Sequence, residues 1–258
     1  MATLPDYAEL HCLSNFSFLR GASHAEELVE RAHALGYRAL AITDDCSLAG
    51  IVRAHTAARQ HGLKLIVGSE FTLDDGLRPV LLAPDRDAYA DLAELITTGR
   101  RQAAKGSYQL NRDDIVRFSR HLLALWLPPT DAALDDAAWL RWTFGERAWI
   151  AVELLLAQDD ALRLAQLEWL GRSARVPLVA AGDVHMHCRS RRALQDTLVA
   201  IRLGTPVAQC GLALFPNGER HLRSRAALAD LYPSQLLAET LRIAERCHFS
   251  LDELRYEY

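Results

Sequence analysis

The sequence lacks a long hydrophobic run and the usual marks of a secreted protein. No apolar stretch in its 258 residues reaches the roughly 20 residues that span a bilayer. Residues 1–30 lack the basic-then-apolar pattern of a secretion signal. The five cysteines are odd in number and scattered, and no Cys-x-x-Cys pair occurs, which argues against a disulfide framework or a cysteine-rich zinc site. These absences predict a cytoplasmic protein with no membrane contact.

The chain also lacks an excess of positive charge. Its net charge is −4, which argues against a broad face that grips nucleic acid. Arg189, Arg191 and Arg192 form one basic cluster, and a second lies at 100–105. Either could touch DNA or a neighbouring domain, although a solvated face is the favoured interpretation. Hydrophobic residues make up 50% of the chain, enough for a substantial core.

Strand and helix patterns alternate along the chain. Short apolar runs bounded by Gly, Pro or polar residues predict buried strands. They cover residues 8–13, 38–43, 64–73, 79–83, 121–127, 149–156 and 177–181. Amphipathic segments between them predict helices, for example over 85–101 and 191–202. This alternation indicates an α/β protein with a parallel sheet and right-handed crossovers, and a barrel of this kind gathers its strand C-terminal ends on one rim.

Chemically active side chains fall at or just after the predicted strand ends. They are His11, Asp44, Asp45, Glu70, Asp183 and His185. Alternate residues of an extended segment point the same way, so Asp183 and His185 can converge on one divalent ion. His11 has no such companion, because Leu13 offers no donor. A zinc site made of Cys12, Cys46, Cys188 and His187 is an alternative at the same rim, although cysteines are more often small buried hydrophobes.

Four segments, in this order and spacing, resemble the PHP (polymerase and histidinol phosphatase) domain. They read HCLSNFSFLRGAS from His11, AITDDCSLAG from Ala41, IVGSEF from Ile66 and GDVHMH from Gly182. The subtype resembles the N-terminal domain of bacterial C-family DNA polymerases, the polymerase III alpha subunits, and most closely the error-prone paralogue of SOS mutagenesis. This resemblance implies a distorted parallel (β/α)7-like barrel over residues 1–205, with a C-terminal helical extension over 206–258 that leads towards a polymerase core.

The resemblance also implies a metal pocket, which here is incomplete. Intact family members bind several metals through His, Asp, Glu or Cys ligands. Matching positions retain His11, Glu70, Asp183 and His185, while Asp45 replaces a histidine as a plausible ligand. Four other ligand positions are lost: they are Leu13, Arg20, Arg78 and Ala157. If any metal binds, the resemblance assigns it to His11, Glu70, Asp183 and His185.

The presence of Arg20 and Arg78 favours a silent pocket, meaning one without a metal centre or hydrolytic activity. A multinuclear hydrolase needs bridging ligands and an open metal position that activates water. Arg20 and Arg78 instead bring permanent positive charges to the place of a cation. We expect one or both to pair with the remaining acids, with Arg20 the nearer.

Two functions from different classes therefore remain. The first is a non-catalytic structural or interaction domain of an error-prone polymerase for translesion synthesis and DNA repair, with no cofactor of its own. The resemblance implies Mg²⁺ for the parent nucleotidyltransferase. It implies as partners the rest of the polymerase chain, DNA, other SOS mutagenesis proteins and the sliding clamp. The alternative is a phosphoesterase or 3′–5′ proofreading exonuclease that uses Zn²⁺ or Mn²⁺.

Overall fold

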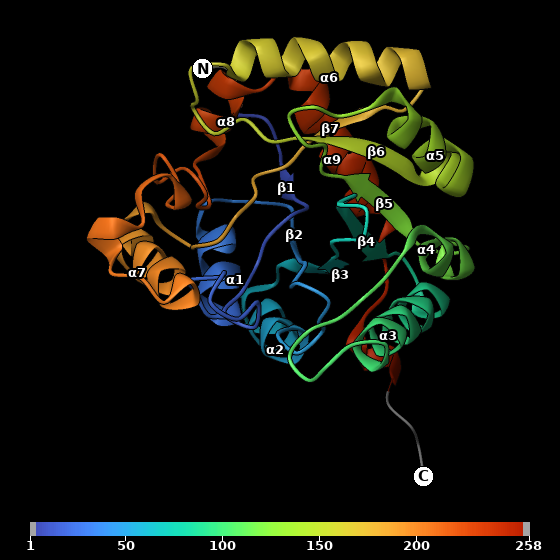
Figure 1. Cartoon of the computed structure of the whole chain (residues 1–258), viewed down its shortest axis with the longest axis horizontal. Helices are drawn as coiled ribbons and strands as arrows, with labels where there is room; N and C mark the ends of the chain where they lie inside the picture. The colour runs from blue at the N-terminus through green and yellow to red at the C-terminus, as the bar shows by residue number, and fades with distance from the viewer. Residues whose placement is uncertain (1–3, 255–258) are drawn as a thin grey trace.

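The computed structural model describes residues 4–254, and their core is one curled sheet of seven strands in the order β1 to β7 (Figure 1). The strands are β1 (Ala8–Glu9), β2 (Ala39–Ile42), β3 (Lys64–Glu70), β4 (Pro79–Ala83), β5 (Leu123–Trp126), β6 (Ala148–Val152) and β7 (Leu178–Ala180). All neighbouring pairs are parallel except those made by β4, which runs against β3 and β5. The expected α/β barrel built on a mostly parallel sheet is thus confirmed, with one strand reversed.

The reversal of β4 follows from a short connection. β3 ends at Glu70 and β4 begins at Pro79, and a turn with Gly76 at φ +85° lies between them. So short a link makes a hairpin, whereas a parallel crossover needs about a dozen residues or more. The Asp75-Gly76 pair is a hairpin signal in the sequence itself.

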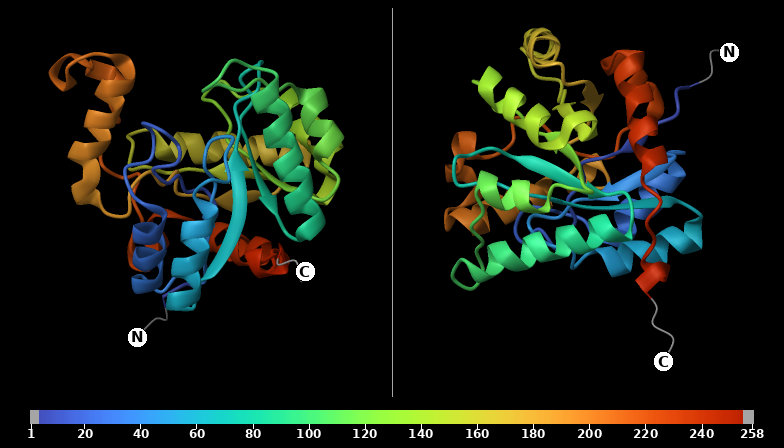
Figure 2. Two further views of the ribbon diagram at one scale, coloured as in Figure 1. Left: turned by 90° about the horizontal axis from the view of Figure 1, so that it is seen from below. Right: turned by 90° about the vertical axis from the view of Figure 1, so that its right-hand side faces the viewer.

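The helices surround the sheet. They are α1 (Ala25–Ala34), α2 (Ile51–His61), α3 (Arg86–Arg101), α4 (Arg112–Phe118), α5 (Leu134–Phe144), α6 (Asp160–Ala174), α7 (Arg192–Leu203), α8 (Arg225–Leu231) and α9 (Ser234–Arg246). Short 3-10 turns are η1 (Gly145–Arg147), η2 (Arg189–Arg191), η3 (Val207–Gln209), η4 (Gly211–Ala213) and η5 (Leu251–Leu254). Figure 2 shows α7 projecting from the body of the molecule. None of the helices within 4–254 is long and apolar enough to cross a bilayer.

Strand alternation divides the core into two layers. Leu40 and Ile42 of β2 face the outer helices, whereas Ala39 and Ala41 face the other side of the sheet. Side chains alternate along every strand, so each strand serves both layers. Ile243 and other residues of α9 complete the inner layer. The C-terminal extension therefore shares the core of the sheet, and the division at residue 205 stays a prediction.

The two ends of the sheet meet at one rim. Beyond β1 and β7 the chain continues extended, and Cys12 forms a parallel bridge with Val184. The backbone N–H of Leu13 donates to the Val184 carbonyl at 2.8 Å, and the N–H of Val184 donates to the His11 carbonyl at 3.0 Å. This contact brings the segments that carry His11 and Asp183 side by side.

Candidate functional site

Glu70 lies at the centre of the rim pocket and is bound by three cationic side chains. Its carboxylate is fully buried at the end of β3. Arg20 Nη2 donates to both oxygens at 3.1 Å, Arg78 Nη2 donates to Oε1 at 2.7 Å, and His11 Nε2 lies 3.0 Å from Oε2. Burial alone would raise the pKa of Glu70, but the hydrogen bond and charge of His11, with the two guanidinium groups, hold it well below its usual range.

The expectation that the arginines pair with the acids is confirmed, but their expected order is wrong. Arg78 makes the shorter contact with Glu70. Arg20 is the more buried of the two and bridges two acids, because its Nη1 lies 2.9 Å from Asp45 Oδ2. Asp45 also accepts a hydrogen bond from the Tyr108 hydroxyl at 2.8 Å. Arg78 reaches its position from the β3–β4 hairpin.

His11 connects Glu70 to a carboxylate that the sequence analysis did not identify. The His11 Nδ1 atom lies 2.7 Å from Glu153 Oε1 and 3.9 Å from Asp183 Oδ1. Burial alone would lower the pKa of His11, but the hydrogen bonds with Glu153 and Glu70 raise it to about 10. Glu153 directly follows β6, and this strand-end position is the signal that could have revealed it.

Asp183 and His185 form a second pair, and Arg220 completes it. His185 Nε2 lies 2.9 Å from Asp183 Oδ1, and Arg220 Nε donates to Asp183 Oδ2 at 2.5 Å. The Arg220 guanidinium lies over the Phe215 ring, 3.8 Å from its centroid. Asp183 itself adopts a φ of +45°, a conformation that costs energy for a residue with a side chain and is typical of functional sites.

Two of the expected lost positions do not line the cavity, which has a volume of about 260 Å³. Leu13 is buried and contributes no donor, and Ala157 lies exposed in the loop after β6. Glu153 rather than residue 157 is the side chain that this strand end brings to His11. The cavity is lined by Arg20, Glu70, Thr72, Arg78, Asp183, His185, Gln195, Arg202, Phe215 and Arg220.

Buried polar groups hold the pocket segments in place. The Glu9 carboxylate in β1 accepts the backbone N–H of His11 at 3.0 Å and that of Gly182 at 2.9 Å. The Tyr232 hydroxyl accepts the N–H of Leu154 at 3.0 Å and donates to the Ala181 carbonyl at 2.8 Å. Residues next to His11, Glu153 and Asp183 are thus fixed by hydrogen bonds. The C-terminal extension supplies one of these supports.

One group of side chains in the described part of the chain could hold a single ion. The Nδ1 of His11 and carboxylate oxygens of Glu153 and Asp183 all lie within 4.8 Å of one another. A multinuclear centre does not fit, because guanidinium groups bind Glu70 and Asp45. The alternative cysteine site is not formed, since no such group among residues 4–254 includes Cys12, Cys46, Cys188 or His187.

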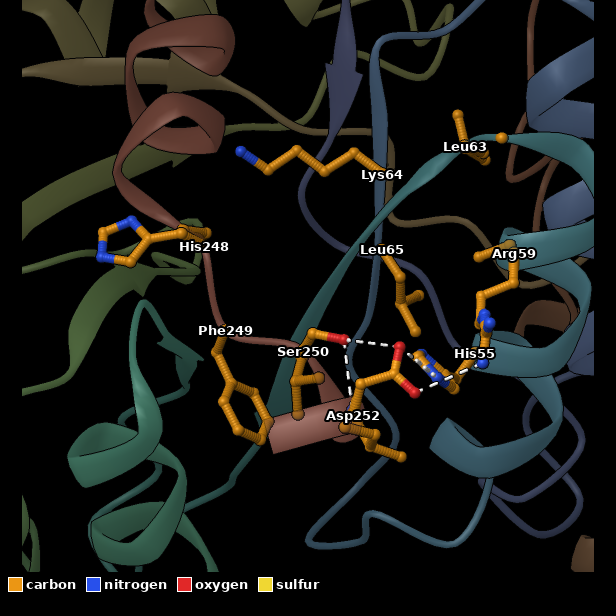
Figure 3. Close-up of a pocket in the computed structure, with 14 residues that line it drawn as sticks. His55, Arg59, Leu63, Lys64, Leu65, His248, Phe249, Ser250 and Asp252 are labelled. Atoms are coloured by element: carbon orange, nitrogen blue, oxygen red, sulfur yellow. Dashed lines mark hydrogen bonds and ion pairs between the residues drawn. The ribbon is translucent and has the colours of Figure 1, made fainter. Parts of the chain in front are cut away.

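A second cavity of about 310 Å³ lies at the opposite end of β3, beside Lys64 (Figure 3). Asp252 is its organising residue. His55 Nε2 lies 3.6 Å and Arg59 Nη1 3.3 Å from the Asp252 carboxylate, and the Ser250 hydroxyl donates to it at 3.4 Å. These contacts join η5 to α2. The cavity is remote from the strand C-terminal ends, where sites form in barrels of this type.

Stability should fall with rising pH between about 6.5 and 10 because of His11. Its raised pKa, from an ordinary 6.5 to about 10 in the fold, means that the stabilisation is complete below pH 6.5 and is lost as pH rises towards 10. Glu153, Glu70 and Asp183 face the ring. Urea unfolding at pH 6.0 and 8.5 measures the effect. His11→Gln should flatten this dependence, and an equal slope in both proteins would contradict the assignment.

The fold and the acidic and imidazole side chains at its rim are those of the PHP class of domain. Residues 9–158 match the family model described as PHP domain. This match covers more than half of the chain, which therefore belongs to the PHP domain family. The expected resemblance is confirmed.

The most similar sequences include error-prone DNA polymerases. The protein from Dechloromonas aromatica (strain RCB) is 59% identical over 261 residues, which cover 99% of this chain and 25% of that protein. The protein from Pseudomonas aeruginosa (strain PAO1) is 60% identical over 252 residues, covering 98% and 24% respectively. The chain thus spans about a quarter of the length of the curated relatives that it matches.

A solved structure supports the fold alone. It is an amidohydrolase from Chromobacterium violaceum with bound sulfate and no metal. The TM-score is 0.50 at 18% sequence identity, and the alignment covers 69% of this chain and 87% of that one.

Proposed function

We propose that this chain is the PHP domain of an error-prone DNA polymerase and that its rim pocket is a structural element without hydrolytic activity. The high identity to error-prone polymerases supports the first part. The contacts of Glu70 carry the second. Both oxygens of this buried carboxylate are bound by Arg20, and Arg78 and His11 bind it as well. The protein's own cations therefore balance the acid that a metal centre would use.

These ion pairs oppose hydrolysis for a physical reason. Metal-assisted hydrolysis needs a cation with an open position for water. A guanidinium cannot lose its proton or coordinate water as a Lewis acid, and a second cation near Arg20 and Arg78 would be repelled. Asp183, which Arg220 and His185 already bind, is equally engaged. The pocket instead connects segments that are distant in sequence.

The role proposed for the whole protein rests on the similarity of this chain to error-prone DNA polymerases. We propose that the rest of the polymerase chain is the partner of this domain and that the parent acts in the cytoplasm in damage-induced translesion synthesis. It would transfer nucleotides with Mg²⁺ and contact DNA, the sliding clamp and other mutagenesis proteins through its other domains.

One observation favours a second candidate, a phosphoesterase or 3′–5′ exonuclease with a single ion. His11, Glu153 and Asp183 offer an imidazole nitrogen and two carboxylate oxygens in one place. This donor set suits Zn²⁺ or Mn²⁺, which would supply Lewis acidity when bound. Glu153 would be a ligand here, and His11 would have to lose its proton first.

Metal analysis and hydrolysis assays separate the two candidates. We expect the purified chain to retain less than one equivalent of Zn²⁺ or Mn²⁺ after dialysis, because the cations of the pocket already bind its acids. We expect background rates on a phosphodiester and on a 3′-recessed DNA duplex in either metal. Asp183→Asn and Glu153→Gln are the controls. A metal-dependent rate that both variants abolish would reject the silent pocket in favour of the hydrolase.

A further inference from the structure

We propose that the rim pocket is a metal-free receptor for a small phosphate-bearing anion, held by Arg78, Arg202 and Arg220. This inference rests on the proposed metal-free state of the pocket. It concerns binding, and not hydrolysis. Arg202 and Gln195, which would both contact the anion, come from α7. Neither residue occupies a position of the family's metal pattern.

The charges of the cavity favour an anion. Four arginines line it, whereas Glu70 and Asp183 are the only carboxylates among the lining residues. Glu70 is shared by Arg20 and Arg78, and Asp183 is bound by Arg220. Arg202 is exposed and makes no ion pair or side-chain hydrogen bond with another residue in the described part of the chain. Arg202 thus offers the cavity a positive charge that no carboxylate of the described residues neutralises.

The arginines keep unused donors in fixed positions. Arg220 is held by one nitrogen, its Nε, on Asp183, and its guanidinium lies over Phe215. Arg78 is held through Nη2 on Glu70. A guanidinium has five N–H donors in a planar fork that fits phosphate oxygens in pairs. Because these two side chains are already positioned, binding an anion would require little further ordering.

Gln195 is an independent indication of a ligand. Its side chain lines the cavity and is only 2% exposed, yet its buried Oε1 has no hydrogen-bond partner within residues 4–254. A buried amide oxygen without a partner is unfavourable. Rotation of the amide by 180° presents its NH₂ group to the same place, where a phosphate oxygen could accept the hydrogen bond. The Thr72 hydroxyl is another donor in the lining.

The size of the cavity limits the ligand. Its volume of about 260 Å³ is below the range of roughly 300–1,000 Å³ that is usual for small-molecule sites. One or two phosphoryl groups fit this space, whereas a base and sugar would extend beyond it. The anion can be a free phosphate or diphosphate, or the terminal phosphate of a nucleic acid strand. The chemistry that recognises each of these is the same.

Calorimetric titration of the chain in EDTA tests the proposal. The probes are inorganic phosphate, pyrophosphate, and a short oligonucleotide with and without a 5′-phosphate. We expect pyrophosphate or the phosphorylated strand to bind, and whichever binds more tightly identifies the source of the anion. Arg202→Gln should weaken binding at least five-fold and Gln195→Leu by a similar factor. Arg242→Gln removes the same charge from the exposed face of α9 and should leave binding unchanged.

Each outcome bears on one proposal or both. Absence of binding by every probe, or equal affinity in wild type and Arg202→Gln, would overturn the anion receptor and leave the silent domain intact. Binding that needs added Zn²⁺ or Mn²⁺ would overturn the receptor and also count against the metal-free pocket. Because Arg202 is exposed, its variant should keep the wild-type midpoint of urea unfolding, and this measurement separates lost binding from lost folding.

Discussion

Glu70→Ala should destabilise the domain by about 3–5 kcal/mol, the cost typical of removing one partner from a buried ion pair. The carboxylate is fully buried and bound by Arg20, Arg78 and His11. Its loss would leave positive groups close together with too little negative charge to balance them. Glu70→Gln keeps the shape but not the charge, so it should be nearly as costly. The shift in the urea unfolding free energy at pH 7 measures both effects.

A surface pair provides the matched control. Glu168 lies 3.6 Å from Arg172 on α6, and both side chains are largely exposed. Glu168→Ala should cost less than about 1 kcal/mol, because water screens exposed pairs. If Glu70→Ala cost no more than this control, the cations around Glu70 would not depend on it, and the structural role proposed for the pocket would fail.

Gly21→Ala should be the second severe change, with a loss of about 3 kcal/mol. A Cβ atom at residue 21 would lie 2.0 Å from the carbonyl oxygen of Ser14. Ser14 cannot move freely, since its N–H and hydroxyl both donate to buried Asp44, at 2.8 and 2.7 Å. The backbone around residue 21 must therefore shift. Arg20 would shift with it, away from Glu70.

The comparison for this variant is Gly76→Ala in the β3–β4 hairpin. A Cβ there meets nothing within 4 Å, so the cost comes only from its φ of +85° and should be about 1 kcal/mol. Thermal and urea unfolding of the two variants give the difference. Equal losses would mean that the contact with Ser14 relaxes easily and that the Arg20 loop is not rigidly placed.

Physical patterns in the sequence predicted most of the residues that form the site. Apolar runs bounded by Gly and Pro predicted the strands, and their shared C-terminal rim predicted that His11, Glu70, Asp183 and His185 would lie together, which the structure shows. Glu153 follows β6 by the same rule. It was missed because the predicted strand ran on to residue 156 and the family resemblance assigned the ligand position after that strand to Ala157. The observed strand β6 ends four residues earlier, at Val152, so Glu153 is the first residue after the strand.

Other features could not be read from local sequence. Arg220 lies 37 residues from Asp183, in a segment without periodicity, and only the packing of the chain between them brings the two together. The antiparallel direction of β4, by contrast, has a local signal, because the short link after β3 contains the hairpin pair Asp75-Gly76. Arg78 lies closer to Glu70 than Arg20 does, and this difference in distance depends on the path of that same hairpin.

The sequence by itself determined the α/β architecture, the rim as the place of the site, and the presence of arginines where family members carry ligands. The first two follow from periodicity and residue chemistry, which are local properties of the chain, and the third follows from the resemblance to the PHP family. Only the tertiary structure decided which charges meet: Arg20 and Arg78 on Glu70, Glu153 on His11, and Arg220 on Asp183. Ion pairing depends on distance and burial between segments far apart in the sequence, and these are set when the sheet curls and its ends join at Cys12 and Val184.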